Sequence, residues 1–101
     1  MYEMLVGLNV LDDAKYESYR HDMRPILNEY RGGFGYDFEV SKVLISKGDA
    51  DINRVFTIYF GSQGLKDKFF TDPRYLEVKE KYFVGSVANT TIISAYETRP
   101  D

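Results

Sequence analysis

The most informative stretch of this sequence is Asn-Arg-Val-Phe-Thr-Ile-Tyr-Phe, at residues 53–60, because it is the richest run of β-branched and aromatic residues between clear turn signals. We predict a central β-strand here. Phe56, Ile58 and Phe60 alternate to form a fully apolar face, and the intervening residues form a mixed face that is apolar enough to be covered. A chain of 101 residues has too little material to cover a sheet on both sides, so a second subunit is expected to supply one layer.

The segments around this strand show strand and helix patterns in turn. Apolar residues that alternate predict strands, and apolar residues at helical spacing predict helices. In the first helix, Tyr16, Tyr19 and Met23 share an apolar stripe with Arg20 at its edge. A polar turn at 47–51 is expected to return the second strand antiparallel into the central one. In chain order we predict a strand at 2–10, a helix at 13–30, a strand at 34–46, the strand at 53–60, a helical region within 61–83 and a strand at 87–96.

This order, β-α-β-β-α-β, is that of the ferredoxin-like split unit, an α+β fold. It predicts a four-stranded antiparallel sheet with the first and third strands in the middle. We expect residues 1–97 to form one such domain and residues 98–101 to form a polar tail. With helices on one face only, the face that carries Leu5 and Val55 would stay exposed in a monomer, and facing sheets in a homodimer would bury it.

Composition excludes several classes of function. The net charge of −3 and the pI of about 5.1 argue against a nucleic-acid surface, which needs clustered lysine and arginine. No apolar run is long enough to cross a bilayer and no signal peptide is recognisable, so we expect a cytoplasmic protein that binds neither nucleic acid nor membrane. The absence of cysteine excludes disulfides and thiol nucleophiles.

A series of short motifs runs along nearly the whole chain. They are Asp12-x-x-x-Tyr16-x-x-Tyr19, Pro25-x-Leu27-x-x-Tyr30-x-Gly32-Gly33, the strand at 54–60, Phe70-x-Asp72-Pro73-x-Tyr75 and a final apolar strand. Together they resemble the DUF1330 family of small uncharacterised proteins. The resemblance implies the dimeric α+β barrel superfamily, in which two ferredoxin-like subunits pack their sheets into a shared barrel.

The resemblance leaves the function open. Its superfamily includes cofactor-free monooxygenases, haem-degrading enzymes, isomerases and proteins without known activity. This sequence has Tyr59 where members of the family carry a glutamate, so any role of that acid does not carry over. Haem-degrading relatives use an Asn, Trp and His set, and this chain has no tryptophan, which argues against that chemistry.

The single histidine, His21, lies nearly opposite the apolar stripe of its helix. A solvated or ion-paired side chain is therefore favoured over a catalytic base, which has to reach a sheltered substrate. No His-x-x-x-His or calcium-loop spacing is present, and one histidine without cysteine makes a poor ligand set. We expect neither a metal nor another cofactor.

Four polar residues are the candidate ligand-binding residues. Asn9, Asp37 and Tyr59 fall on one strand face by alternation, together with Glu39, and Arg20 is the candidate partner of Asp37. In the structural interpretation, Arg20 and Tyr59 simply satisfy Asp37, because an isolated buried charge is very costly. In the functional interpretation, these groups form the polar end of an aromatic pocket and orient a small ligand with carboxylate or phenolate oxygens.

Two functions from different classes remain. The first is a homodimeric α+β barrel that binds a small aromatic or acyl metabolite, with a cofactor-independent monooxygenase- or isomerase-like enzyme as one form of it. The second is a dimerisation or assembly protein without a ligand pocket. No nucleophile with an adjacent base is visible in the sequence, so covalent catalysis is not predicted. The presence or absence of a cavity that ends at Arg20 discriminates between the two.

Overall fold

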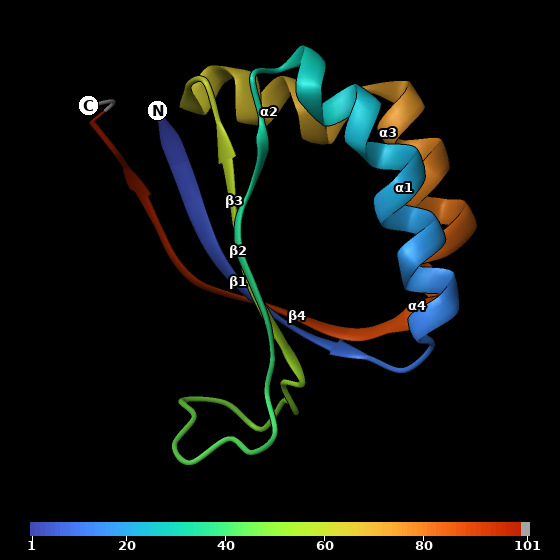
Figure 1. Ribbon diagram of the computed structural model, residues 1–101, viewed down its shortest axis with the longest axis vertical. Coiled ribbons are helices and arrows are strands. Elements are labelled where there is room, and N and C mark those ends of the chain that lie inside the picture. Colours follow the sequence, from blue (N-terminus) through green and yellow to red (C-terminus); the bar gives the residue numbers. More distant parts are fainter. Residues whose placement is uncertain (100–101) are drawn as a thin grey trace.

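We analysed a computed structural model of the chain, which describes residues 1–99. A four-stranded sheet is covered on one side by helices (Figure 1). Pro100 and Asp101, half of the expected polar tail, lie outside the described residues. The elements are β1 (Tyr2–Val10), α1 (Asp13–Glu29), β2 (Gly33–Glu39), β3 (Arg54–Phe60), α2 (Gln63–Thr71), α3 (Pro73–Val78), the π-helix η1 (Lys79–Phe83), α4 (Val84–Ser86) and β4 (Val87–Glu97).

The sheet has the strand order β2-β3-β1-β4, and each pair of neighbours is antiparallel. The first and third strands are therefore central, as predicted, and the α+β ferredoxin-like fold class is confirmed. Both central strands bury their apolar alternation against the helices, with Phe56, Ile58 and Phe60 fully buried in β3.

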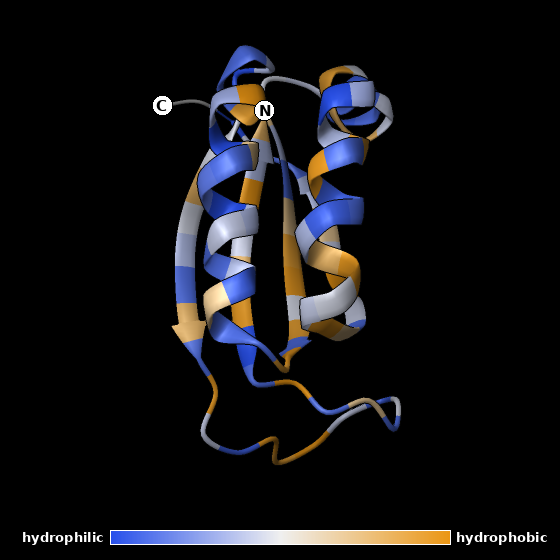
Figure 2. Cartoon of the chain, turned by 90° about the vertical axis from the view of Figure 1, so that its right-hand side faces the viewer, coloured by the Kyte–Doolittle hydropathy of each residue, from blue (hydrophilic) through white to orange (hydrophobic). Residues whose placement is uncertain are grey.

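The helices lie side by side over that face, α1 on one side and α2 to α4 on the other (Figure 2). The helices α1, α2 and α3 each begin where a side chain accepts from a free backbone N–H of the first turn. Asp12 accepts from the amide of Lys15 at 3.0 Å and so caps the N-terminus of α1. Asp72 does the same for α3 by accepting from the amide of Arg74 at 2.8 Å, with proline at the first helical position.

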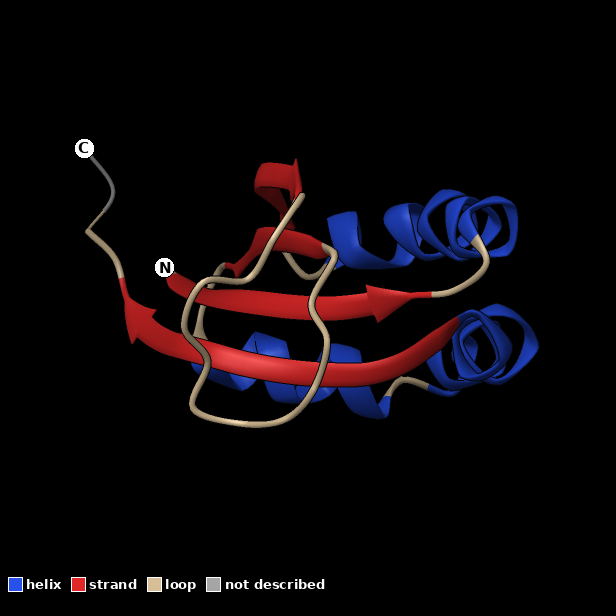
Figure 3. Ribbon diagram, turned by 90° about the horizontal axis from the view of Figure 1, so that it is seen from below, coloured by secondary structure: helices blue, strands red, loops and turns tan. Residues whose placement is uncertain are grey.

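The second strand is shorter than predicted. It ends at Glu39, and residues 40–53 form a loop that protrudes from the end of the sheet where α1 begins (Figures 1 and 3). A strand has to pair its backbone groups, and β3 begins only at Arg54, so residues 41–46 have no partner strand despite their alternation. The loop returns through Ile52, whose side chain packs against Gly7, where a Cβ would crowd it.

A β-bulge in β2 changes which of its side chains face the helices, compared with the faces predicted from alternation. Phe34 pairs with Ile58, whereas Asp37 pairs with Phe56, so the strand gains one residue between these pairs. Asp37 therefore points to the helix side of the sheet. The prediction that Asp37 shares a face with Tyr59 is wrong, because an extra residue reverses the alternation of everything after it.

The face of the sheet away from the helices, called the open face below, is covered by no helix. Tyr36 and Phe38 stack on each other there, with ring centroids 5.8 Å apart, and they are 66% and 55% exposed. Apolar exposure of this kind on one face is typical of an interaction surface. The open face carries Leu5, Gly7, Asn9, Tyr36, Phe38, Val55, Thr57, Tyr59 and Tyr96.

Candidate functional site: an aromatic cavity with a buried arginine

A cavity of about 220 Å³ lies between the helices and the sheet. Its wall is mostly apolar, as in most small-molecule sites. Its charged residues are Arg20 and Lys79, and no carboxylate lines it. The apolar part of the wall comes from Met4, Val6, Leu8, Met23, Phe34, Phe56, Ile58, Phe70, Phe83 and Ile92, and the other polar residues are Tyr16, Tyr19, Tyr75 and Thr90.

Arg20 is the polar centre of this cavity. Its position at the edge of the apolar stripe of α1 brings it under the helix, where it is only 3% exposed. Its Nε donates to the hydroxyl of Tyr16 at 2.7 Å, and its Nη1 donates to Asp37 at 3.2 Å. The guanidinium carbon lies 3.9 Å from the ring centroid of Phe34 and 4.7 Å from that of Phe56, so aromatic faces stabilise the cation.

One nitrogen of Arg20 is left over. Nη2 is buried and has no hydrogen-bond acceptor among the described residues. A buried donor without a partner is costly, and more so when it is charged. Arg20 also lines the cavity, and a buried cation with an unused donor beside an apolar cavity is the arrangement expected of a site for an anionic group.

Asp37 does not explain the burial of Arg20, because a second arginine already neutralises it. Arg54 donates to both carboxylate oxygens of Asp37, from Nε and from Nη2, at 2.8 Å each. These bonds are the main reason that the pKa of Asp37 is lowered, and the same pair raises the pKa of Arg54. The side chain of Asp37 is also 31% exposed, so water reaches it. We call Tyr16, Arg20, Asp37 and Arg54 the Arg20 cluster.

A pair of tyrosines forms a second polar point in the wall. The hydroxyls of Tyr19 and Tyr75 lie 2.8 Å apart, and both side chains are buried. Burial raises the pKa of both phenols, so both stay protonated at neutral pH. Lys79 contributes to the wall from the start of η1. A π-helical turn of this kind often accompanies functional sites because it re-aims the side chains that follow.

The other two candidate residues lie elsewhere. Asn9 is on the open face near the end of β1, where its amide oxygen is 3.4 Å from Nδ2 of Asn53. Tyr59 is on the same face at the opposite end of β3, paired across the strands with Glu3 and Gly33. Neither lines the cavity. The structure thus brings Arg20 and Asp37 together and separates them from the other two.

The single histidine lies at the surface of the part of the chain that the structure describes, residues 1–99. His21 is 89% exposed and lies beside Asp22, with Nδ1 and Oδ1 3.1 Å apart. Within that range no three His, Asp or Glu side chains gather in a way that could hold a metal ion. No helix in the same residues has both the length and the apolar character needed to span a membrane.

Comparison with known proteins supports the fold. The sequence matches no family model, and no curated protein matches it. A protein of unknown function from Rhodopseudomonas palustris superposes with a TM-score of 0.77 at 19% identity, over 98% of this chain and 83% of that one.

Two further solved structures carry descriptive names. A DABB family protein with a ferredoxin-like fold from Mesorhizobium loti gives a TM-score of 0.66 at 16% identity, over 98% and 97% of the two chains. A dimeric ferredoxin-like protein of unknown function from Jannaschia gives 0.58 at 13% identity, over 96% and 98%. Identities this low show similarity of fold alone.

Sequence reasoning identified Arg20 but missed most of its surroundings. Arg54 was interpreted only as part of the central strand, and the hydroxyl pair of Tyr19 and Tyr75 spans 56 residues of sequence. The strand and helix periods placed these side chains on inward faces. They carried no signal for which inward side chains would meet.

Proposed function

We propose that this protein binds a small aromatic or acyl metabolite that carries a carboxylate or phenolate oxygen, in the cavity between the helices and the sheet. The observation that carries the proposal is Arg20, a buried cation that lines an apolar cavity and has one guanidinium nitrogen, Nη2, without a protein acceptor. Such a donor gains most from a ligand oxygen, because a charge-assisted hydrogen bond forms where water is largely excluded. The alternative, an assembly protein without a pocket, does not account for a cavity of about 220 Å³ at this arginine.

The size of the cavity limits the ligand. An apolar protein cavity of about 150 Å³ holds one benzene molecule. The cavity here is larger by about half, which leaves room for an aromatic ring with a short substituent, or for a short acyl chain. A cofactor-independent enzyme of the monooxygenase or isomerase kind is included in the proposal, with the wall tyrosines as proton donors.

The test compares an acid with its neutral analogue. Titration calorimetry with 4-isopropylbenzoate and 4-isopropylbenzamide is expected to give tighter binding of the acid. Arg20→Gln should weaken the acid by about tenfold to a hundredfold, the value of a hydrogen bond to a charged group. Lys68→Gln removes one exposed positive charge from α2 and serves as the matched control. Equal binding of acid and amide, or an unchanged affinity in the Arg20 variant, would contradict the proposal.

We also propose that the protein is a homodimer whose subunits pack their open faces together, as the resemblance to the DUF1330 family and the dimeric α+β barrel superfamily implies. The exposed stack of Tyr36 and Phe38 supports this, and so does the dimeric relative from Jannaschia. Light scattering at micromolar concentration should give twice the chain mass of 11.7 kDa. Tyr36→Asp with Phe38→Lys should shift the mass to that of the monomer, and a wild-type monomer would rule the dimer out.

A further inference from the structure

The two hydroxyl groups of Tyr19 and Tyr75 have one hydrogen that takes no part in the hydrogen bond between them. Each phenol carries one hydroxyl hydrogen, and a single hydrogen bond of 2.8 Å between the two oxygens employs only one of them. The second hydrogen has no acceptor among the described residues. Since the raised pKa keeps both phenols neutral, the pair offers one O–H donor that no protein group takes up.

This donor lines the same cavity as Arg20 but belongs to a separate hydrogen-bonded group. The ring of Tyr19 stacks on that of Tyr16 with centroids 5.7 Å apart, and it is Tyr16 that accepts from Arg20. Phe83 closes the other side of Tyr19, with ring centroids 4.9 Å apart. The residues that line the cavity therefore include a charged donor, Arg20, and a neutral donor, the Tyr19–Tyr75 pair, among mostly apolar side chains.

A ligand that met only Arg20 would leave the tyrosine hydrogen buried and unpaired. Leaving a buried donor without an acceptor costs about 1–3 kcal/mol, so a ligand with an acceptor at that point is selected over one without. No carboxylate lines the cavity to compete for this hydrogen. The two donors in the cavity wall therefore favour a small molecule that carries two hydrogen-bond acceptors.

We infer that the ligand is a bifunctional acid, anionic at the end that meets Arg20 and carrying an uncharged carbonyl, hydroxyl or ether oxygen at the end that meets Tyr19 and Tyr75. This inference rests on the proposed function and narrows its ligand class to oxo- or oxy-substituted aromatic or acyl acids. The tyrosine pair is then a specificity determinant, whereas Arg20 is the determinant of affinity for acids in general.

The test uses probes of equal size. 3- and 4-acetylbenzoate carry a carbonyl oxygen where 3- and 4-isopropylbenzoate carry a methyl group. One acetyl isomer is expected to bind the wild-type protein about three- to tenfold tighter than its isopropyl partner, the value of one neutral hydrogen bond. The two isomers are included because the ring position of the oxygen decides which of them reaches the pair.

The informative variant is the double change Tyr19→Phe with Tyr75→Phe. A single change leaves one hydroxyl that can still donate, whereas the double change removes both partners of one bond and leaves the packing intact. Replacing both partners by apolar groups of the same shape is close to neutral for stability. The double variant should therefore fold, lose the preference for the acetyl probe and keep its affinity for the isopropyl probe.

The outcomes separate the two claims. Equal binding of acetyl and isopropyl probes to the wild type, with both weakened by Arg20→Gln, overturns the bifunctional ligand and leaves the proposed function in place. A preference for the acetyl probe that survives the double change overturns the role of the tyrosines. Failure of all four acids to bind the wild type overturns the proposed function, and the inference with it.

Discussion

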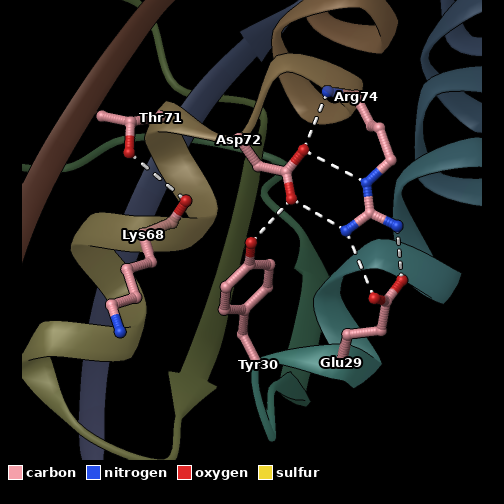
Figure 4. Close-up of polar contacts among 6 residues, drawn as sticks. All are labelled: Glu29, Tyr30, Lys68, Thr71, Asp72 and Arg74. Atoms are coloured by element: carbon pink, nitrogen blue, oxygen red, sulfur yellow. Dashed lines mark hydrogen bonds and ion pairs between the residues drawn. The ribbon is translucent and has the colours of Figure 1, made fainter.

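Two arginine–carboxylate clusters in this molecule contain similar residues but differ in how completely their guanidinium groups are hydrogen-bonded. In the Arg74 cluster, formed by Glu29, Tyr30, Asp72 and Arg74, every guanidinium nitrogen donates to a carboxylate (Figure 4). In the Arg20 cluster, Nη2 of Arg20 is buried and has no acceptor among the described residues. The two arginines differ in burial, because Arg74 is 54% exposed and Arg20 is only 3% exposed.

The difference teaches where to look for function. Water would satisfy a spare donor on Arg74 at little cost, yet that residue has none, because its role is to join the end of α1 to the start of α3. A spare donor on Arg20 is expensive, since water is largely excluded there. A costly feature that the fold does not need for its own stability is more informative about ligand binding than a paired one.

The largest loss of stability is expected from Asp72→Ala in the Arg74 cluster. Asp72 caps α3, accepts from the hydroxyl of Tyr30 at 2.6 Å and holds Arg74, and all three contacts disappear together. Thermal unfolding should show a clear fall in Tm. Asp72→Asn is the control, because asparagine is also a good N-cap and loses mainly the ionic part. A Tm of Asp72→Ala equal to that of wild type would show that the cluster does not hold the helices together.

The next effect separates the two arginines around Asp37. Arg54→Met removes both close hydrogen bonds to a partly buried carboxylate, and we expect the free energy of unfolding to fall by about 2 kcal/mol. Arg20→Met should change it by no more than about 1 kcal/mol, because Arg54 still neutralises Asp37 and methionine fits aromatic surroundings. Urea unfolding measures both.

The control for this pair is the double change Arg54→Met with Asp37→Asn. In Arg54→Met alone, the carboxylate of Asp37 keeps only its 3.2 Å contact to Arg20, and Asp37→Asn removes that charge. The double change should therefore recover part of the lost stability. A larger loss from Arg20→Met than from Arg54→Met would mean that Arg20 serves the fold. The spare nitrogen would then carry no information about a ligand.

The fold was predictable from periodicity, whereas half of the site was not. The alternation in 53–60 and the helical spacing of apolar residues predicted the element order and the central strands, since these signals are local. The bulge between Phe34 and Asp37 depends on pairing with β3, so the sequence of β2 alone could not reveal it. The face of Asp37, and with it the contact to Arg54, was therefore beyond sequence reasoning.

Loop and helix boundaries failed for related reasons. Residues 41–46 alternate like a strand, but an alternating segment forms one only if a neighbour offers its backbone. The π-helical turn at Lys79–Phe83 packs against α1, and the sequence patterns used for prediction carry no signal for such a turn. Arg20 was found because a long cationic side chain at the edge of an apolar stripe is conspicuous on a helical wheel.

The smallest expected effect, and the finest comparison of the two clusters, is their dependence on pH. The arginine bonds lower the pKa of both aspartates from the usual 3.8, Asp72 mainly through Arg74 and Asp37 mainly through Arg54. A carboxyl whose pKa is lower in the folded state adds stability that is complete above the unfolded pKa and is lost as the pH falls through the folded one. Each cluster should therefore weaken below about pH 4.

Because Asp72 accepts more hydrogen bonds than Asp37, its pKa is lowered further. Asp72→Asn should therefore remove more of the loss of stability at low pH than Asp37→Asn. The measurement is the difference in the free energy of unfolding between pH 6 and pH 3, from urea titrations of wild type and both variants. Comparing variants cancels the other acidic residues, which titrate in all three proteins. If Asp37→Asn proved the less acid-sensitive variant, Asp37 would be the more tightly held carboxylate. The Arg20 cluster would then be a structural unit like the other, and the case for a ligand at Nη2 would weaken.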